Sequence, residues 1–217
     1  MKLKYLLFSK ILPMKILRKI RRRIIHTMNW QVSPPPYELK REILSSYKND
    51  YALNVFIETG TFFGDTVEYF KNSFKKVYSI ELAEELAKKA KLRFANDSQV
   101  EIIQGDSGSI LKGILKDIDE PVLFWLDGHY SSEFFVGDEF IKTARTDKDT
   151  PVVEELDTIL SSPINHVILI DDARLFDGLG DYPSISSIKR KVRKAKGPAY
   201  GCKVENDIIQ ICPKIVQ

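Results

Sequence analysis

Acidic residues stand at the ends of the apolar segments of this 217-residue chain. At these positions their side chains could bind ligands. Five short apolar runs have the length and composition of buried strands, and each ends in an acid or is soon followed by one. These acids are Glu58, Glu81, Asp106, Asp127 and the pair Asp171 and Asp172. The carboxyl ends of parallel strands meet at one edge of a sheet, where ligands bind. Any single acid, such as Asp65 or Asp106, could instead be a helix N-cap or a solvated loop residue, but the joint placement favours a site.

The first strand end carries the turn Glu58-Thr59-Gly60-Thr61-Phe62-Phe63-Gly64-Asp65. Its glycines let the backbone approach a ligand closely, and the helix that follows offers free N–H groups. Glu81 lies 21 residues after Gly60, where a carboxylate can accept hydrogen bonds from both ribose hydroxyls. A nucleotide-like ligand is therefore expected. The Gly-x-x-x-Gly spacing differs from the Gly-x-Gly-x-x-Gly of dinucleotide sites, which disfavours a nicotinamide cofactor.

A second group of polar residues follows the fourth and fifth apolar runs. Asp127 and the pair Asp171-Asp172 would face one cleft, and their oxygens suit Mg²⁺, which could bind a vicinal diol and lower the pKa of its hydroxyl. His129 is the candidate general base, since an unperturbed imidazole has a pKa of about 6.5. The alternative is a loop histidine hydrogen-bonded to Asp127.

The segment from 131 to 150 is long, polar and interspersed with aromatic residues. Long loops beside an active site often act as lids. Tyr130, Arg145 and Arg174 are candidates for contacts with an acceptor. An ordinary surface excursion is the alternative.

The elements that must position these residues alternate between strand and helix. Strands are expected at 54–58, 76–80, 100–104, 122–126 and 167–170, and helices at 36–49, 64–72, 83–95, 109–115, 152–160 and 184–195. The segments 200–204 and 208–212 indicate a terminal hairpin. We therefore expect an α/β fold with a Rossmann-like doubly wound sheet, mostly parallel, that ends in an antiparallel hairpin.

Together, the acid-x-Gly-x-x-x-Gly turn, the acid at position 81 and Gly105-Asp106 resemble the class I S-adenosylmethionine-dependent methyltransferases over about residues 50 to 213. Phe62 and Phe63 depart from the family pattern, because they fill the centre of a turn that usually carries another small residue. The resemblance implies that Glu58, Gly60 and Gly64 surround the methionine moiety, that Glu81 holds the ribose, and that Asp106 with Ser107 lies near the adenine. Thr61 and Asp127 are further residues expected to bind the cofactor.

The acids after the fourth and fifth strands are similar to those of metal-dependent O-methyltransferases of the catechol and macrolide-sugar types. That resemblance implies that Asp127, Asp171 and Asp172 bind Mg²⁺. Asp127 and His129 are the residues that we predict to be catalytic. The expected function is O-methylation of a sugar or glycan hydroxyl with S-adenosylmethionine. The alternatives are a catalytically silent nucleotide-binding or scaffold protein of the same fold, and a nicotinamide-dependent oxidoreductase.

Charge divides the chain into an arm, residues 1–36, and a body, residues 37–217. Residues 1–37 contain nine of the 33 basic residues and no acid, which leaves 24 basic and 30 acidic residues in the remainder. An acidic body disfavours nucleic-acid binding. Basic residues and helically spaced apolar residues across 1–28 predict a helix on an anionic membrane surface, with packing on the domain, contacts in a homodimer, or disorder as alternatives. A cytoplasmic protein, peripheral at the inner membrane face, is expected.

Overall fold

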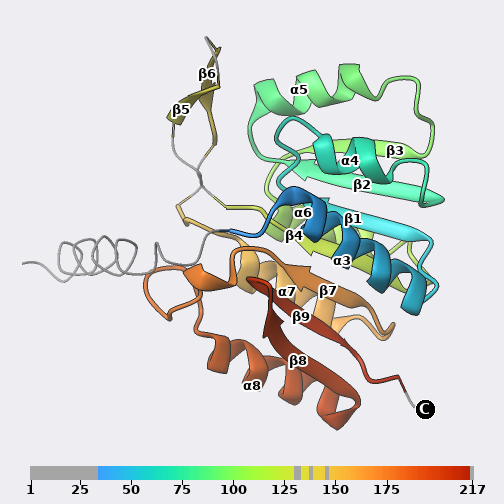
Figure 1. Cartoon of the computed structure of the whole chain (residues 1–217), viewed down its shortest axis with the longest axis vertical. Helices are drawn as coiled ribbons and strands as arrows, with labels where there is room; N and C mark the ends of the chain where they lie inside the picture. The colour runs from blue at the N-terminus through green and yellow to red at the C-terminus, as the bar shows by residue number, and fades with distance from the viewer. Residues whose placement is uncertain (1–33, 130–132, 137–138, 145–146, 216–217) are drawn as a thin grey trace, which may run out of the picture.

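The computed structural model describes residues 34–129, 133–136, 139–144 and 147–215, and the predicted membrane-binding segment 1–28 lies outside them. A seven-stranded sheet forms the centre (Figure 1), in the order β3-β2-β1-β4-β7-β9-β8. Its strands are β1 (Val55–Thr59), β2 (Lys76–Glu81), β3 (Val100–Gln104), β4 (Val122–Leu126), β7 (Val167–Ile170), β8 (Tyr200–Glu205) and β9 (Ile208–Pro213).

Strands β3, β2, β1, β4 and β7 are parallel, whereas β9 runs antiparallel to both β7 and β8. The predicted doubly wound sheet with a terminal antiparallel hairpin is therefore confirmed. Every residue of β1, β4 and β7 is buried, so both faces of these strands are covered. This explains why they are continuous apolar runs rather than alternating ones.

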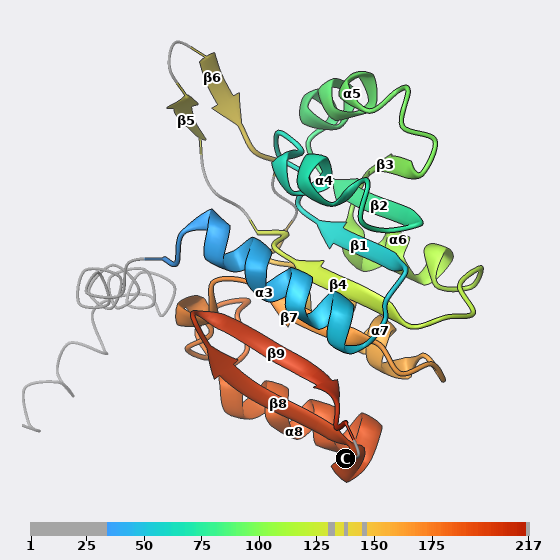
Figure 2. The same ribbon diagram turned by 45° about the vertical axis from the view of Figure 1, so that its right-hand side comes forward.

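Helices cover the two faces in two layers (Figure 2). One face packs against α3 (Tyr37–Asp50), α4 (Asp65–Phe70) and α5 (Glu84–Arg93) through Leu44, Val67 and Ala90. The other packs against α6 (Ser107–Ile114), α7 (Val152–Ser161) and α8 (Ile185–Lys196) through Leu111, Leu156 and Ile188. Short 3₁₀ turns are η2 (Ala173–Leu175) and η3 (Gly197–Ala199). The two apolar cores leave the carboxyl edge of the sheet as the place for polar side chains.

The segment 131–150 differs from the expectation of a loop. It contains an antiparallel hairpin of β5 (Glu133–Val136) and β6 (Glu139–Lys142), which stands away from the main sheet in Figure 1. Two apolar runs around Gly-Asp are a hairpin signal that the sequence already carried. Tyr130 and Arg145, predicted to contact the acceptor, lie outside the described residues.

Helix α3 begins at Tyr37, directly after the three prolines, and Pro34 and Pro35 border the cavity described below. The division into an arm of residues 1–36 and a domain of 37–217 stays a prediction. Over the described part of the chain, the helices are too short and too polar to cross a bilayer.

Candidate active site

A cavity of about 550 Å³ runs along the carboxyl edge of the sheet. Its lining includes five of the residues predicted to bind the cofactor, namely Gly60, Glu81, Asp106, Ser107 and Asp127. One end is lined by His129, Asp171, Asp172 and Arg174, together with Tyr37 and Lys40 from α3. Cofactor-type and catalytic-type residues thus share one cavity, as the strand-end pattern predicted.

Glu81 is fixed at the cavity by the backbone around it. Its two oxygens accept hydrogen bonds from the N–H of Phe62 at 2.9 Å and that of Ala83 at 2.9 Å. Burial raises the pKa of Glu81 although these bonds stabilise its charged form, because the side chain is 7 % exposed. The backbone N–H groups of Thr61 and Leu82 also favour the charged form, so the turn after β1 and the end of β2 hold this carboxylate at the cavity. The Phe62 ring borders the cavity beside Leu86, which adds apolar surface there.

The two glycines of the turn are required by their surroundings. Gly60 has φ +89°, and a Cβ there would lie 2.7 Å from the carbonyl oxygen of Asp127. Gly64, the N-cap of α4, has φ +82°, and a Cβ there would lie 2.6 Å from a ring atom of Phe94. Gly60 therefore keeps the first turn close to the strand β4 end, whereas Gly64 serves packing behind it.

Glu58 and Thr61 lie behind the cavity rather than in its lining. The Ser79 hydroxyl donates to Glu58 Oε2 at 2.7 Å and lies 2.7 Å from the Thr61 hydroxyl. Burial, which leaves Glu58 2 % exposed, raises its pKa to about 8, and the charges of Asp127 and Glu81 act in the same direction. Glu58 is therefore a neutral carboxyl at pH 7, embedded in a hydroxyl network that stiffens the turn.

Asp106 is both an N-cap and a cavity residue. It accepts hydrogen bonds from the N–H of Ser109 at 3.1 Å and from its hydroxyl at 2.7 Å, so the capping alternative is correct for this residue. Ser107 lines the cavity and donates from Oγ to Glu155 Oε1 at 2.6 Å. Glu155 was not predicted as a site residue, since it lies inside a helix rather than at a strand end.

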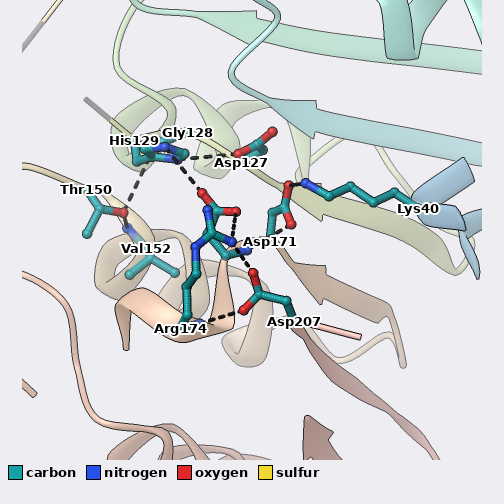
Figure 3. A network of polar contacts seen from close by, with 10 residues as sticks. Lys40, Asp127, Gly128, His129, Thr150, Val152, Asp171, Arg174 and Asp207 are labelled. Carbon is teal, nitrogen blue, oxygen red and sulfur yellow. Dashed lines mark hydrogen bonds and ion pairs between the residues drawn. The ribbon is translucent and has the colours of Figure 1, made fainter. Parts of the chain in front are cut away.

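At the opposite end, His129 lies between two carboxylates (Figure 3). Its Nδ1 is 3.3 Å from Asp127 Oδ1, and its Nε2 is 3.6 Å from Asp172 Oδ2. Burial disfavours the imidazolium, but the hydrogen bond with Asp127 and the nearby aspartate charges outweigh burial and raise the pKa of His129. The pairing with Asp127 that was weighed as an alternative is therefore present.

The adjacent acids Asp171 and Asp172 have different partners. Asp171 forms an ion pair with Lys40 of α3 and accepts a hydrogen bond from the N–H of Asp172 at 2.8 Å. Burial raises the pKa of Asp171 to about 7, the charges of Asp127 and Asp172 raise it further, and Lys40 opposes them. Asp172 pairs instead with Arg174, at 2.8 Å. Lys40 was missed because α3 precedes the strand-end pattern.

Arg174 links the site to the terminal hairpin. Its guanidinium pairs with Asp207 as well as Asp172, and its backbone N–H donates to Asp207 Oδ1 at 2.8 Å. Burial opposes the charge of Arg174, but the two carboxylates raise its pKa overall. The predicted acceptor contact by Arg174 is compatible with its position in the cavity wall.

Among the described residues, the metal-type cluster consists of Asp127, His129 and Asp172, whose ligand atoms lie within 4.8 Å of one another. The predicted set had Asp171 in place of His129. Two carboxylates and an imidazole fit a divalent cation, but the nitrogen favours Mn²⁺ or Zn²⁺ over Mg²⁺, which prefers oxygen ligands alone. His129, first assigned as a base, is therefore also a possible ligand.

Solved structures with the same fold are numerous. An O-methyltransferase from Bacillus cereus in complex with S-adenosylhomocysteine aligns with a TM-score of 0.54 and 15 % identity over 94 % of this chain and 93 % of its own. The Podospora anserina methyltransferase PaMTH1, also bound to S-adenosylhomocysteine, aligns with a TM-score of 0.51 and 13 % identity over 94 % and 89 %. The chain has the fold of the class I S-adenosylmethionine-dependent methyltransferases.

An rRNA methylase from Streptococcus thermophilus aligns with a TM-score of 0.46 and 12 % identity over 84 % of this chain and 98 % of its own, a likeness that carries no argument about substrate. Neither the family models nor the curated proteins yield a match to the sequence. The fold is thus established by structure, and the chemistry must be inferred from the cavity.

Proposed function

We propose that this protein is a methyltransferase that moves the methyl group of S-adenosylmethionine to a hydroxyl of a sugar or glycan. One observation carries the proposal. A single cavity joins a nucleoside-type end, at Glu81, Asp106 and Ser107, to a proton-transfer end at Asp127 and His129. The known structures of this fold that hold S-adenosylhomocysteine support the choice of cofactor.

The cofactor-binding residues fall into two groups in this proposal. Glu81 binds the ribose hydroxyls, Gly60 admits the methionine portion, and Asp106 with Ser107 borders the adenine. Glu58, Thr61 and Gly64 act indirectly, because they shape the turn from behind. S-adenosylmethionine held by these residues would supply an electrophilic methyl group for the acceptor hydroxyl.

His129 takes the proton of the acceptor hydroxyl in this mechanism. Asp127 accepts the Nδ1–H of the imidazole, which leaves the Nε2 lone pair to receive the proton. Asp172 then lies beside the imidazolium and stabilises its charge. Lys40 and Arg174 hold Asp171 and Asp172 in place, so that the acceptor meets an ordered wall.

A divalent cation is a second element of the proposal. Asp127, His129 and Asp172 would hold it, and it would supply a Lewis acid that lowers the pKa of an acceptor hydroxyl. Its presence would make His129 a ligand rather than the base. Removal of the cation by a chelator distinguishes these two roles of His129.

The acceptor end favours a polar, hydroxyl-rich molecule. Charged side chains surround it, and the Tyr37 ring, which is 67 % exposed, offers a flat face on which a sugar ring can stack. Carboxylates dominate the cavity, and residues 38–217 hold 24 basic against 30 acidic residues, so a polyanionic RNA acceptor is disfavoured. We further propose that residues 1–28 bind the anionic inner face of the cytoplasmic membrane, where glycan acceptors are assembled, and that the enzyme is a homodimer.

Calorimetric titration with S-adenosylmethionine tests the proposal. The full chain should bind one equivalent, and Glu81→Ala should weaken binding at least tenfold because both ribose hydrogen bonds are lost. Glu85→Ala, at an exposed position on α5, is the matched control. A folded wild-type chain that binds no S-adenosylmethionine would contradict the proposal.

A further inference from the structure

Glu155 is a buried acid on the first turn of α7, and the proposed mechanism does not use it. Only 1 % of its surface is exposed, and it lies behind the cavity wall. Burying a carboxyl costs free energy unless its oxygens find hydrogen-bond partners. An apolar side chain would fill this place more cheaply, so the contacts of Glu155 indicate what it does.

Three strand-end segments meet at Glu155. The Ser107 hydroxyl, at the start of α6 after β3, donates to its Oε1 at 2.6 Å. The hydroxyl of Thr59, the last residue of β1, adjoins the carboxyl from a second side. Gly128, after β4, closes the third side: a Cβ there would lie 3.6 Å from Glu155 Oε1 and 3.1 Å from the Thr59 hydroxyl.

Each of these segments contributes to the wall of the cavity. Ser107 and Gly128 line it directly, and Thr59 precedes Gly60, which also lines it. We propose that Glu155 is a positioning residue that joins the loops after β1, β3 and β4 and so sets the shape of the cofactor end. This inference rests on the proposed cofactor site, since it assigns the group that holds that site in register.

The residue before the N-cap of α7 also supports the proton-transfer end. Thr150, which is buried, contacts the carbonyl oxygen of Gly128 through its hydroxyl at 3.4 Å and accepts the N–H of Val152 at 3.3 Å (Figure 3). Gly128 directly precedes His129. The start of α7 therefore contacts the segment after β3 through the bond between Glu155 and Ser107. It contacts the segment after β4 through Thr150, so the same part of the chain positions the cofactor end and the base.

Substitutions at Glu155 can distinguish a side chain that positions the loops by hydrogen bonding from one that only fills space. Burial raises the pKa of Glu155 to about 7, against the Ser107 hydrogen bond, which favours its charged form. Glutamine has nearly the same shape and keeps a carbonyl oxygen that can accept the Ser107 hydrogen bond. Leucine fills the volume but accepts nothing, and Ser107→Ala removes the donor while leaving Glu155 in place.

A double-mutant cycle on S-adenosylhomocysteine affinity tests the inference. The full-length wild type, Glu155→Leu, Ser107→Ala and the double variant are titrated calorimetrically, with folding checked by circular dichroism. Each single variant should weaken binding at least tenfold, and the double variant should bind within about threefold of the weaker single variant, because both remove one interaction. Glu155→Gln should stay within about threefold of the wild type. Asp157→Asn, at an exposed position on the same helix, is the matched control.

Two results would overturn the positioning role. The first is a folded Glu155→Leu or Ser107→Ala variant that binds S-adenosylhomocysteine as tightly as the wild type. The second is a double variant whose loss of binding free energy equals the sum of the two single losses. If Glu155→Leu does not fold, Ser107→Ala and Glu155→Gln decide by the same criteria. Absence of binding by the folded wild type is a separate outcome, which removes the proposed cofactor site and the premise of this inference with it.

Discussion

Glu58→Gln should become more stable than the wild type as the pH rises, because the wild type loses stability when Glu58 is ionised. Burial of its carboxyl raises the pKa of Glu58 from an ordinary value of 4.5 to about 8 in the folded chain. Between these two values the unfolded chain releases a proton that the folded chain retains. Stability is therefore fully present below the lower value and is lost progressively as the pH rises toward 8.

The size of the effect follows from this interval. At about 1.4 kcal/mol for each pKa unit, an interval of about 3.5 units corresponds to roughly 5 kcal/mol. Glutamine resembles the protonated carboxyl in shape and keeps an acceptor for the Ser79 hydroxyl, which donates at 2.7 Å. The variant should thus match the wild type near pH 4.5 and exceed its stability by several kcal/mol at pH 8.

Urea denaturation followed by circular dichroism at pH 5, 6, 7 and 8 measures this difference directly. The free energy of unfolding of Glu58→Gln minus that of the wild type should grow steadily with pH. Glu85→Gln, at an exposed site, should show a difference that does not change with pH. A difference for Glu58→Gln that is the same at pH 5 and pH 8 would refute the assignment of a buried, neutral Glu58.

Three further outcomes are expected. His129→Ala should lower kcat about 10²- to 10⁴-fold while S-adenosylmethionine still binds. The wild-type rate should rise with pH as His129 loses its proton, through its raised pKa. An unchanged kcat in the variant would rule out general-base catalysis by His129. Activity that survives EDTA is expected where His129 is the base, whereas loss in EDTA with recovery in Mn²⁺ identifies a metal at Asp127, His129 and Asp172. Gly60→Ala should lower the free energy of unfolding measured in urea by about 1–3 kcal/mol, because φ is +89° and the added Cβ would lie 2.7 Å from a backbone oxygen. A stability equal to that of the wild type would contradict this geometry.

The fold was largely predictable because local patterns and tertiary structure agree. The buried strands β1, β4 and β7 are short apolar runs between turn residues, and nothing in their surroundings overrides that signal. The first helix after β1 is shorter than expected, ending at Phe70 rather than at residue 72. The β5–β6 hairpin was missed because its polar flanks were interpreted as a loop, although its Gly-Asp centre is a turn signal.

The site was predictable only where its residues follow strands. Glu81, Asp106 and Asp127 reach the cavity because the topology brings strand ends together. Lys40 reaches the cavity from α3, and Glu155 on α7 lies behind the cavity wall, on the opposite face of the sheet. Helical periodicity does not reveal which polar residue of a helix points inward. The different partners of Asp171 and Asp172 likewise depend on Lys40 and Arg174, which lie outside the strand-end pattern.

A crystal structure of the full chain with S-adenosylhomocysteine tests most directly the claim that one cavity serves both cofactor and proton transfer. The ribose hydroxyls should lie within hydrogen-bond distance of Glu81, the amino-acid portion beside Gly60, and the sulfur should face the end of the cavity that holds Asp127 and His129. A ligand bound elsewhere, or one whose sulfur faces away from His129, would contradict the account.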